Sequence, residues 1–156
     1  MNFKFLRIFF LTLIIFPLPS LCLSEQPDSQ KWVFFADNCY YNKNFTKSSN
    51  IISVWTYFTV TDDFRKETIQ DIKKDDFNKS IRYKNYDYIV SLSEFDCTKK
   101  LFRMKEFMDC DYDGNILEHI TTDNNNWENI TPDSSFDKLY EKVCVTRKNP
   151  LKKKKM

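Results

Sequence analysis

The chain has 156 residues, of which 42% are hydrophobic, 17% are aromatic and 29% are charged, and its formal net charge is +2. This length suits one domain with a real hydrophobic core, so no second domain is expected. No basic patch or base-stacking motif recurs through the body of the chain, which argues against nucleic-acid binding.

The N-terminus is typical of a secretory signal peptide. Lys4 and Arg7 precede the apolar run 8–16, which is shorter than the roughly 20 apolar residues of a membrane span. Prolines follow, and then Cys22 and Ser24 place small side chains before Glu25. We predict cleavage after Ser24, leaving no transmembrane span in the mature chain.

Cys22 also allows a lipoprotein interpretation, in which cleavage precedes an acylated cysteine. Leu21 disfavours this alternative, because the residue before a lipidated cysteine is normally very small. Cleavage after Ser24 removes 24 residues, leaves 132, and balances the mature chain at 22 basic and 22 acidic side chains. Residues 148–156 form a lysine-rich tail, whereas 25–147 carry 17 basic and 22 acidic residues.

The mature chain retains four cysteines, which is an even number for a protein bound for an oxidising compartment. Their spacing lacks the close pairs of zinc knuckles and redox motifs, so it predicts two disulfides and neither a metal site nor a cofactor. The sequence alone allows three pairings of these residues, Cys39, Cys97, Cys110 and Cys144.

Short runs of β-branched and aromatic residues, bounded by Asn, Asp and Ser clusters, predict strands through most of the domain. The predicted strands are 32–36, 39–42, 51–60, 86–95, 100–112 and 115–122. The cluster 42–50 is expected to be a loop. The charged stretch 61–85 has a weak helical stripe after a possible N-cap at Thr61, and we expect a loop there with one short helix.

Asp113-Gly114 between two strand-like runs predicts a hairpin, with Gly114, the only glycine, at positive φ. Asp109, Asp111 and Asp113 also match the opening of an EF-hand loop. Its bidentate glutamate is replaced by Ile120, so the hairpin is the better interpretation.

One convincing helix is predicted after Pro132, with Ser134 as N-cap and Asp137 as the acidic partner of a capping box. An apolar stripe then runs along this helix through Phe136, Leu139, Tyr140 and Val143. Cys144 follows it, so a disulfide from Cys144 to a strand would staple the helix to the sheet.

Several short motifs occur in the order of one family: Trp32, Tyr40-Tyr41-Asn42, Val54-Trp55, Phe95-Asp96-Cys97, Tyr112-Asp113-x-Asn115, Trp127-x-x-Ile130, Pro132-x-Ser134 and Val143-Cys144. Through these motifs the chain resembles the surface-adhesin E family of Gram-negative bacteria, over about residues 32–144. The resemblance implies an α+β fold, in which an antiparallel sheet of about six strands curves around a C-terminal helix. It also implies a disulfide between Cys97 and Cys144, and it leaves Cys39 and Cys110 as the second pair.

The same resemblance implies an exported protein of the outer-membrane surface or periplasm that binds host extracellular-matrix proteins, with possible self-association through its sheet. Alternatives are a periplasmic structural or accessory protein, or a binder of a small ligand such as haem between helix and sheet. An enzyme is not expected: His119 is the only histidine, no nucleophile motif is present, and carboxylates such as Glu94 and Asp96 form no recognisable catalytic pair. Trp55, Tyr57, Tyr86 and Tyr88 could line an adhesive face, but we expect them in the core under the helix.

Overall fold

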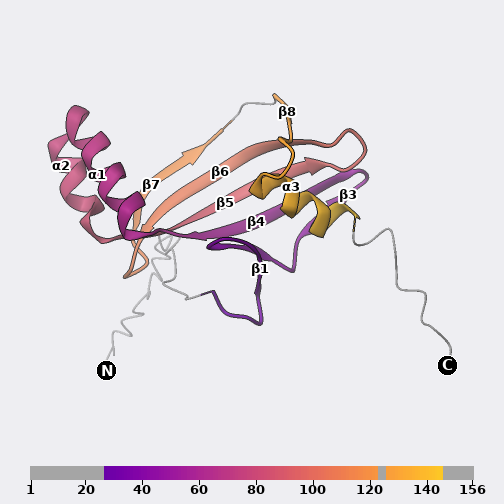
Figure 1. The fold of residues 1–156 in the computed structure, drawn as a ribbon, viewed down its shortest axis with the longest axis horizontal. Coiled ribbons are helices and arrows are strands. Elements are labelled where there is room, and N and C mark those ends of the chain that lie inside the picture. Colours follow the sequence, from indigo (N-terminus) through magenta and orange to yellow (C-terminus); the bar gives the residue numbers. More distant parts are fainter. Residues whose placement is uncertain (1–26, 123–125, 146–156) are drawn as a thin grey trace, which may run out of the picture.

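The computed structural model describes residues 27–122 and 126–145. The predicted signal peptide 1–24, Cys22 and the lysine-rich tail 148–156 lie outside the described residues. The described part is one twisted antiparallel sheet with helices at two places on it (Figure 1). No helix in these two ranges is long and apolar enough to cross a membrane.

Six strands form the main path of the sheet, in the order β1-β2-β4-β5-β6-β7, and every pairing is antiparallel. The predicted sheet of about six strands is therefore confirmed. These strands are β1 (Trp32–Ala36), β2 (Cys39–Asn42), β4 (Ile51–Thr59), β5 (Tyr86–Asp96), β6 (Leu101–Asp111) and β7 (Ile116–Thr121). Each differs from its predicted range by no more than one residue at either end.

Two very short strands were not predicted. β3 (Thr46–Ser48) pairs with β4 inside the stretch expected to be a loop, and β8 (Glu128–Asn129) pairs with β6. All three residues of β3 are exposed, so the strand has no apolar alternation to reveal it.

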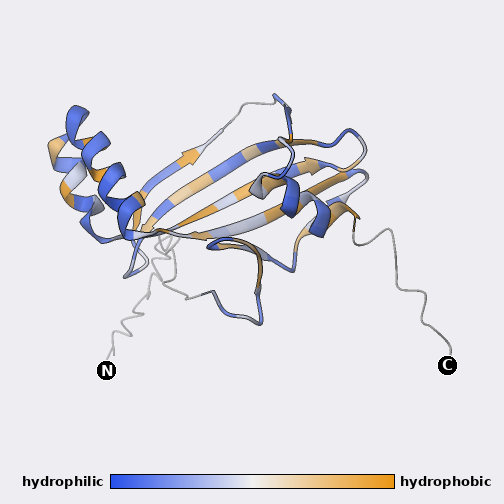
Figure 2. Ribbon diagram, in the orientation of Figure 1, coloured by the Kyte–Doolittle hydropathy of each residue, from blue (hydrophilic) through white to orange (hydrophobic). Residues whose placement is uncertain are grey.

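The register of β4 on β5 separates the two faces of the sheet. Ile52, Val54, Thr56 and Phe58 lie opposite Phe95, Ser93, Ser91 and Ile89 on one face. The other face carries Trp55 and Tyr57, opposite Leu92 and Val90. Figure 2 shows hydrophobic and hydrophilic residues interspersed along the long strands. Both faces bury apolar side chains.

Helix α3 (Ser135–Tyr140) packs on the first face and continues as the π-helical turn Glu141–Val145 (Figure 1). The Ser134 hydroxyl accepts a hydrogen bond from Asp137 N, which confirms the predicted N-cap. The Asp137 carboxylate accepts from Asp133 N, one residue before the cap, rather than from Ser134 N. The predicted stripe of the helix packs in the main core with Ile52, Val54 and Phe95.

The Cys97–Cys144 disulfide joins the end of β5 to the turn after α3, with a Cα–Cα distance of 5.4 Å. The Tyr140 hydroxyl donates to Cys97 O at 3.0 Å and reinforces the same attachment. The predicted covalent tether between helix and sheet is confirmed.

The charged stretch 61–85 is more helical than we expected. It forms α1 (Asp62–Asp75), α2 (Phe77–Arg82) and the 3-10 turn Tyr83–Asn85, a hairpin at one end of the sheet (Figure 1). Thr61 caps α1 as predicted, by accepting from Phe64 N. Asp76 ends α1 and also caps α2 by accepting from Lys79 N.

The predicted pairing of Cys39 with Cys110 is not formed, because Cys39 carries a free thiol, whereas Cys110 is a disulfide-bonded cysteine. Cys39 pairs with Phe58, Phe58 with Ile89, and Ile89 with Asp109, the neighbour of Cys110. Three interstrand steps of about 4.8 Å put β2 and β6 roughly 14 Å apart, whereas bonded cysteines need Cα atoms within about 7 Å.

Candidate functional site

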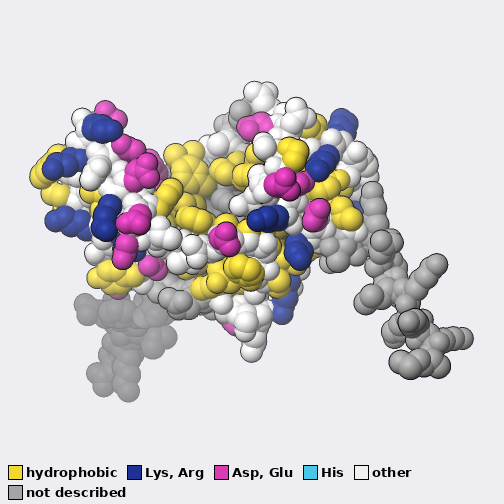
Figure 3. Space-filling model, viewed as in Figure 1, with side chains coloured by type: hydrophobic (Ala, Val, Ile, Leu, Met, Phe, Trp, Pro, Cys, Tyr) yellow, Lys and Arg dark blue, Asp and Glu magenta, His cyan; other side chains and the backbone are white. Residues whose placement is uncertain are grey.

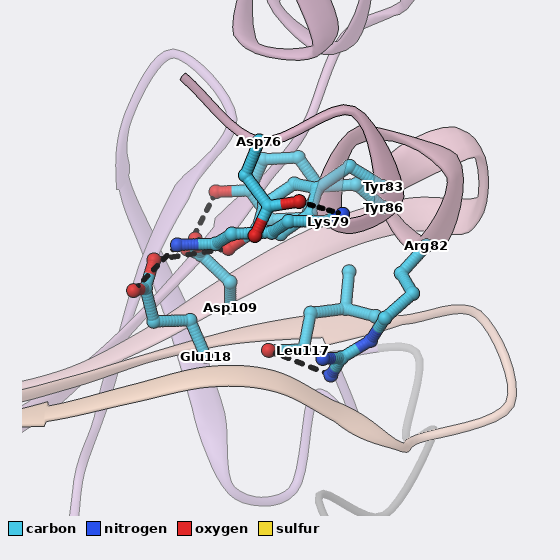
Figure 4. Close-up of polar contacts among 8 residues, drawn as sticks. All are labelled: Asp76, Lys79, Arg82, Tyr83, Tyr86, Asp109, Leu117 and Glu118. Atoms are coloured by element: carbon cyan, nitrogen blue, oxygen red, sulfur yellow. Dashed lines mark hydrogen bonds and ion pairs between the residues drawn. The ribbon is translucent and has the colours of Figure 1, made fainter. Parts of the chain in front are cut away.

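A buried polar network holds the helical hairpin on the sheet (Figure 4). Asp109 of β6 is 7% exposed and accepts from the Tyr83 hydroxyl at 2.8 Å and from the Tyr86 hydroxyl at 2.7 Å. Burial raises the pKa of the Asp109 carboxyl, although the two tyrosine hydrogen bonds act in the opposite direction. Burial, followed by the bond to Asp109, raises the pKa of both tyrosines. The side chains of Asp109, Tyr83 and Tyr86 are therefore buried and hydrogen-bonded to one another, which is a structural role.

Two further contacts tie α2 to β7 beside this network. Lys79 Nζ lies 2.7 Å from Glu118 Oε1, and the Arg82 guanidinium donates to Leu117 O at 2.9 Å (Figure 4). Tyr83 also approaches Glu118 Oε2 at 3.2 Å. Every charged group here has a partner within the fold, so the network attaches the hairpin to the sheet and presents no isolated acid or base.

The Asp-Gly hairpin turn has the predicted geometry, with Gly114 at φ 83°. The Asp111 carboxylate accepts from the backbone N–H groups of Asp113 and Asn115 at 3.0 and 2.8 Å and from the Asn115 amide. Asp109 lies outside this turn network and accepts the hydrogen bonds from the Tyr83 and Tyr86 hydroxyls. In 27–122 and 126–145, no group of three His, Cys, Asp or Glu side chains is placed to hold a metal ion.

The other titratable residues named from the sequence occupy separate places. His119 pairs with Glu106 across β6 and β7 at 2.7 Å. Glu94 binds Arg103 at 2.6 Å, whereas Asp96 accepts from Thr98 in the β5–β6 turn. The structure does not bring these residues together as a catalytic group.

An aromatic ladder crosses the face of the sheet opposite α3. Phe34, Tyr40, Tyr57 and Tyr88 are successive neighbours, with ring centroids 5.6, 6.3 and 4.8 Å apart. The last pair is stacked and buried, and burial raises the pKa of Tyr88 to about 12. The expectation that Tyr57 and Tyr88 lie under α3 was wrong, because both belong to the opposite face.

Tyr86 packs in a different cluster from Tyr88, although both belong to β5. The pairing of β5 with β6 shifts between Tyr86 and Tyr88, and Tyr86 packs with Tyr83 and Val60 beneath the hairpin. Trp55 is only half-buried on β4. The four aromatics grouped in the sequence therefore belong to three packing environments: Tyr57 and Tyr88 share one, and Tyr86 and Trp55 each occupy another.

An apolar pocket of about 410 Å³ opens beside α3 on the first face of the sheet. Its floor comes from β4, β5 and β6, with Thr56, Ser91 and Met104 among the lining residues, and its walls include Cys39 and Phe136. In Figure 3, hydrophobic side chains gather on this face between the α1–α2 hairpin and α3. The small-ligand alternative placed a ligand between helix and sheet, but sequence reasoning named none of the pocket residues as ligand-binding. Their signal is the small hydroxyl residues at the helix-facing positions of two central strands.

His119 is not among the residues that line this pocket. It pairs with Met108, which packs with Tyr57 and Tyr88 on the opposite face. The only histidine is therefore not placed to ligate a group bound between α3 and the sheet.

Comparison with known proteins relates most of the described fold to one family. The family model "Surface-adhesin protein E" matches residues 39–145. Among solved structures, crystal form II of Haemophilus influenzae protein E matches with a TM-score of 0.50 and 6% identity, over 82% of this chain and 98% of that one. This similarity supports the fold. No curated protein matches the chain.

Proposed function

Because the chain belongs to the surface-adhesin protein E family, we propose that it is an exported binding module that attaches the bacterial surface to extracellular-matrix proteins of a host. The family match over residues 39–145 is the observation that carries this proposal. Cleavage after Ser24 and display on the outer membrane are part of the same proposal.

The disulfide-bonded fold supports the proposal that the domain functions outside the cytoplasm. A disulfide between Cys97 and Cys144 persists in an oxidising compartment and fixes α3 on the sheet. A non-enzymatic role is supported by the partners of the titratable side chains: Asp109, Glu94 and His119 each bind neighbouring residues in the fold. The chemistry of the domain is then recognition.

The α2 helix offers the contact surface that we assign to this binding. Phe77 and Ile81 lie four residues apart on α2 and are 59% and 45% exposed. The hairpin that bears them projects at one end of the molecule (Figure 1). Exposed aromatic and aliphatic side chains on a projecting element are typical anchors of protein–protein contacts.

Binding of the mature protein to a panel of immobilised extracellular-matrix proteins tests the proposal directly. We expect saturable binding to at least one of them, and at least a tenfold loss of affinity for the double variant Phe77→Ser/Ile81→Ser. Phe34→Ser, which alters an equally exposed aromatic residue on β1, is the matched control and should retain affinity. Loss in the control alone would move the contact surface to β1, and absence of any binding would refute adhesion.

Protease shaving of intact cells tests where the domain is displayed. A surface domain should be removed while a periplasmic marker survives. If the domain is digested only after cell lysis, it is periplasmic, and the structural or accessory role replaces adhesion.

A further inference from the structure

The pocket beside α3 lies where neither helical element covers the sheet. The α1–α2 hairpin packs on Val60, Tyr86 and Leu117 at one end, and α3 packs on Ile52 and Val54 towards the other. Between these two covers, the helix-facing positions carry Thr56 on β4 and Ser91 on β5. Small side chains on the floor leave space that larger residues would fill.

The pocket offers a ligand almost nothing but apolar surface. Its volume of about 410 Å³ falls within the 300–1,000 Å³ typical of small-molecule sites. The lining residues include no Asp, Glu, Lys, Arg or His. The Thr56 and Ser91 hydroxyls are 2.6 Å apart and bind each other, and Thr56 also approaches Ser91 O at 3.4 Å.

These features select the chemical class of the ligand. A ligand rich in polar atoms would lose hydrogen bonds to water without finding partners on the floor, whereas a hydrocarbon chain loses none. Affinity must therefore come from the burial of the chain.

We propose that this pocket binds the alkyl tail of an acyl-chain ligand between α3 and the sheet, with the polar head left at the mouth. The proposal goes beyond adhesion and does not depend on it, because the pocket and the exposed residues of α2 are separate. The chain could come from a free fatty acid or from a lipid, and the tail chemistry is common to both.

The first experiment uses the mature protein and the neutral fluorophore N-phenyl-1-naphthylamine. We expect saturable enhancement of its fluorescence, reversed by dodecanoate or by lauroyl lysophosphatidylcholine below their micelle concentrations. Displacement by dodecanoate alone indicates a free fatty acid, and displacement by the lysolipid alone indicates a lipid. Displacement by both indicates recognition of the tail only, and displacement by neither refutes the proposal.

Ser91→Phe places a large side chain on the pocket floor and should weaken fluorophore binding at least tenfold. Ser48→Phe makes the same change on exposed β3, outside the pocket lining, and should leave affinity unchanged. Equal affinity in the two variants would overturn the assignment of the site. Far-UV circular dichroism of each variant checks that it is folded.

Cys39 provides a second measurement that needs no change to the pocket floor. Its free thiol lines the pocket and is half-buried. Dodecanoate, or the lysolipid if that is the active competitor, should slow alkylation of Cys39, measured by mass spectrometry of its peptide. An unchanged rate under saturating ligand would place the ligand elsewhere and refute the proposal, whatever the behaviour of the Ser91→Phe variant.

Discussion

The Cys97–Cys144 disulfide gives the sharpest prediction about stability. Its two cysteines are 47 positions apart in the sequence, and they join the end of β5 to the turn after α3. In the chain-entropy model, a closed loop of this length destabilises the unfolded state by about 4 kcal/mol at 25 °C. The double variant Cys97→Ala/Cys144→Ala should lose about that free energy of unfolding. The loss is a large share of the roughly 5–15 kcal/mol that stabilises an ordinary domain.

Urea unfolding followed by circular dichroism measures this loss. With an m-value of about 2 kcal/mol/M, the midpoint of unfolding should fall by about 2 M. Cys39→Ala is the matched control, because Cys39 carries no disulfide in the structure and should cost less than about 1 kcal/mol. A loss below about 1 kcal/mol in the double variant would refute the tether. An equally large loss in the control would mean that Cys39 is bonded after all.

Three further predictions concern buried polar groups. The fully buried Ser93 hydroxyl has no hydrogen-bond partner in the described structure, so Ser93→Ala should raise the urea-unfolding free energy by about 1 kcal/mol. Tyr86→Phe removes a bond to the buried Asp109 carboxylate and should lower that free energy by about 1.5–3 kcal/mol. Because the pKa of Asp109 is raised in the folded state, protonation of this carboxyl stabilises the fold. This stabilisation is fully present below the unfolded pKa of about 3.9 and is lost as the pH rises through the folded pKa. The pH profile of unfolding should therefore lose this decline in Asp109→Asn, and identical profiles would contradict the assigned pKa direction.

The strands and α3 could be predicted because their signals are local. Alternation along β4, the Asp113-Gly114 turn and the Ser134 cap each depend on residues close in the sequence, and the structure has all three. Only the donor to the Asp137 carboxylate differs from the predicted capping box. That carboxylate accepts from Asp133 N, and Asp133 adopts a positive φ of 62° just before the cap.

The α1–α2 hairpin was underestimated because its helices bury so little. The apolar stripe of α1 is weak, and none of its residues is fully buried. Its packing on the sheet comes from tertiary contacts of two partly buried residues of the helix, Ile69 and Ile72. Asp76, which ends one helix and caps the next, was the missed local signal.

The wrong disulfide and the misplaced aromatics have a different cause. The distance from Cys39 to Cys110 depends on the order of four strands, which no local pattern contains. The face occupied by Tyr86 depends on a register shift against β6, and one such shift moves a side chain to the other side of a sheet. Strand order and bulges are properties of the assembled sheet.

The pocket follows from the same combination of local and assembled properties. Along β5 the helix-facing positions read Phe95, Ser93, Ser91 and Ile89, so large residues occupy the two ends and small ones the middle. The large ends pack in the clusters beneath α3 and beneath the hairpin. If another part of the chain covered Ser91, the small residues in the middle of β5 would simply mean that the strand packs weakly there. Because Ser91 instead lines the open pocket, its small size has a direct consequence: it leaves room for a ligand between the two helical covers, at a point where Ser91→Phe would close it.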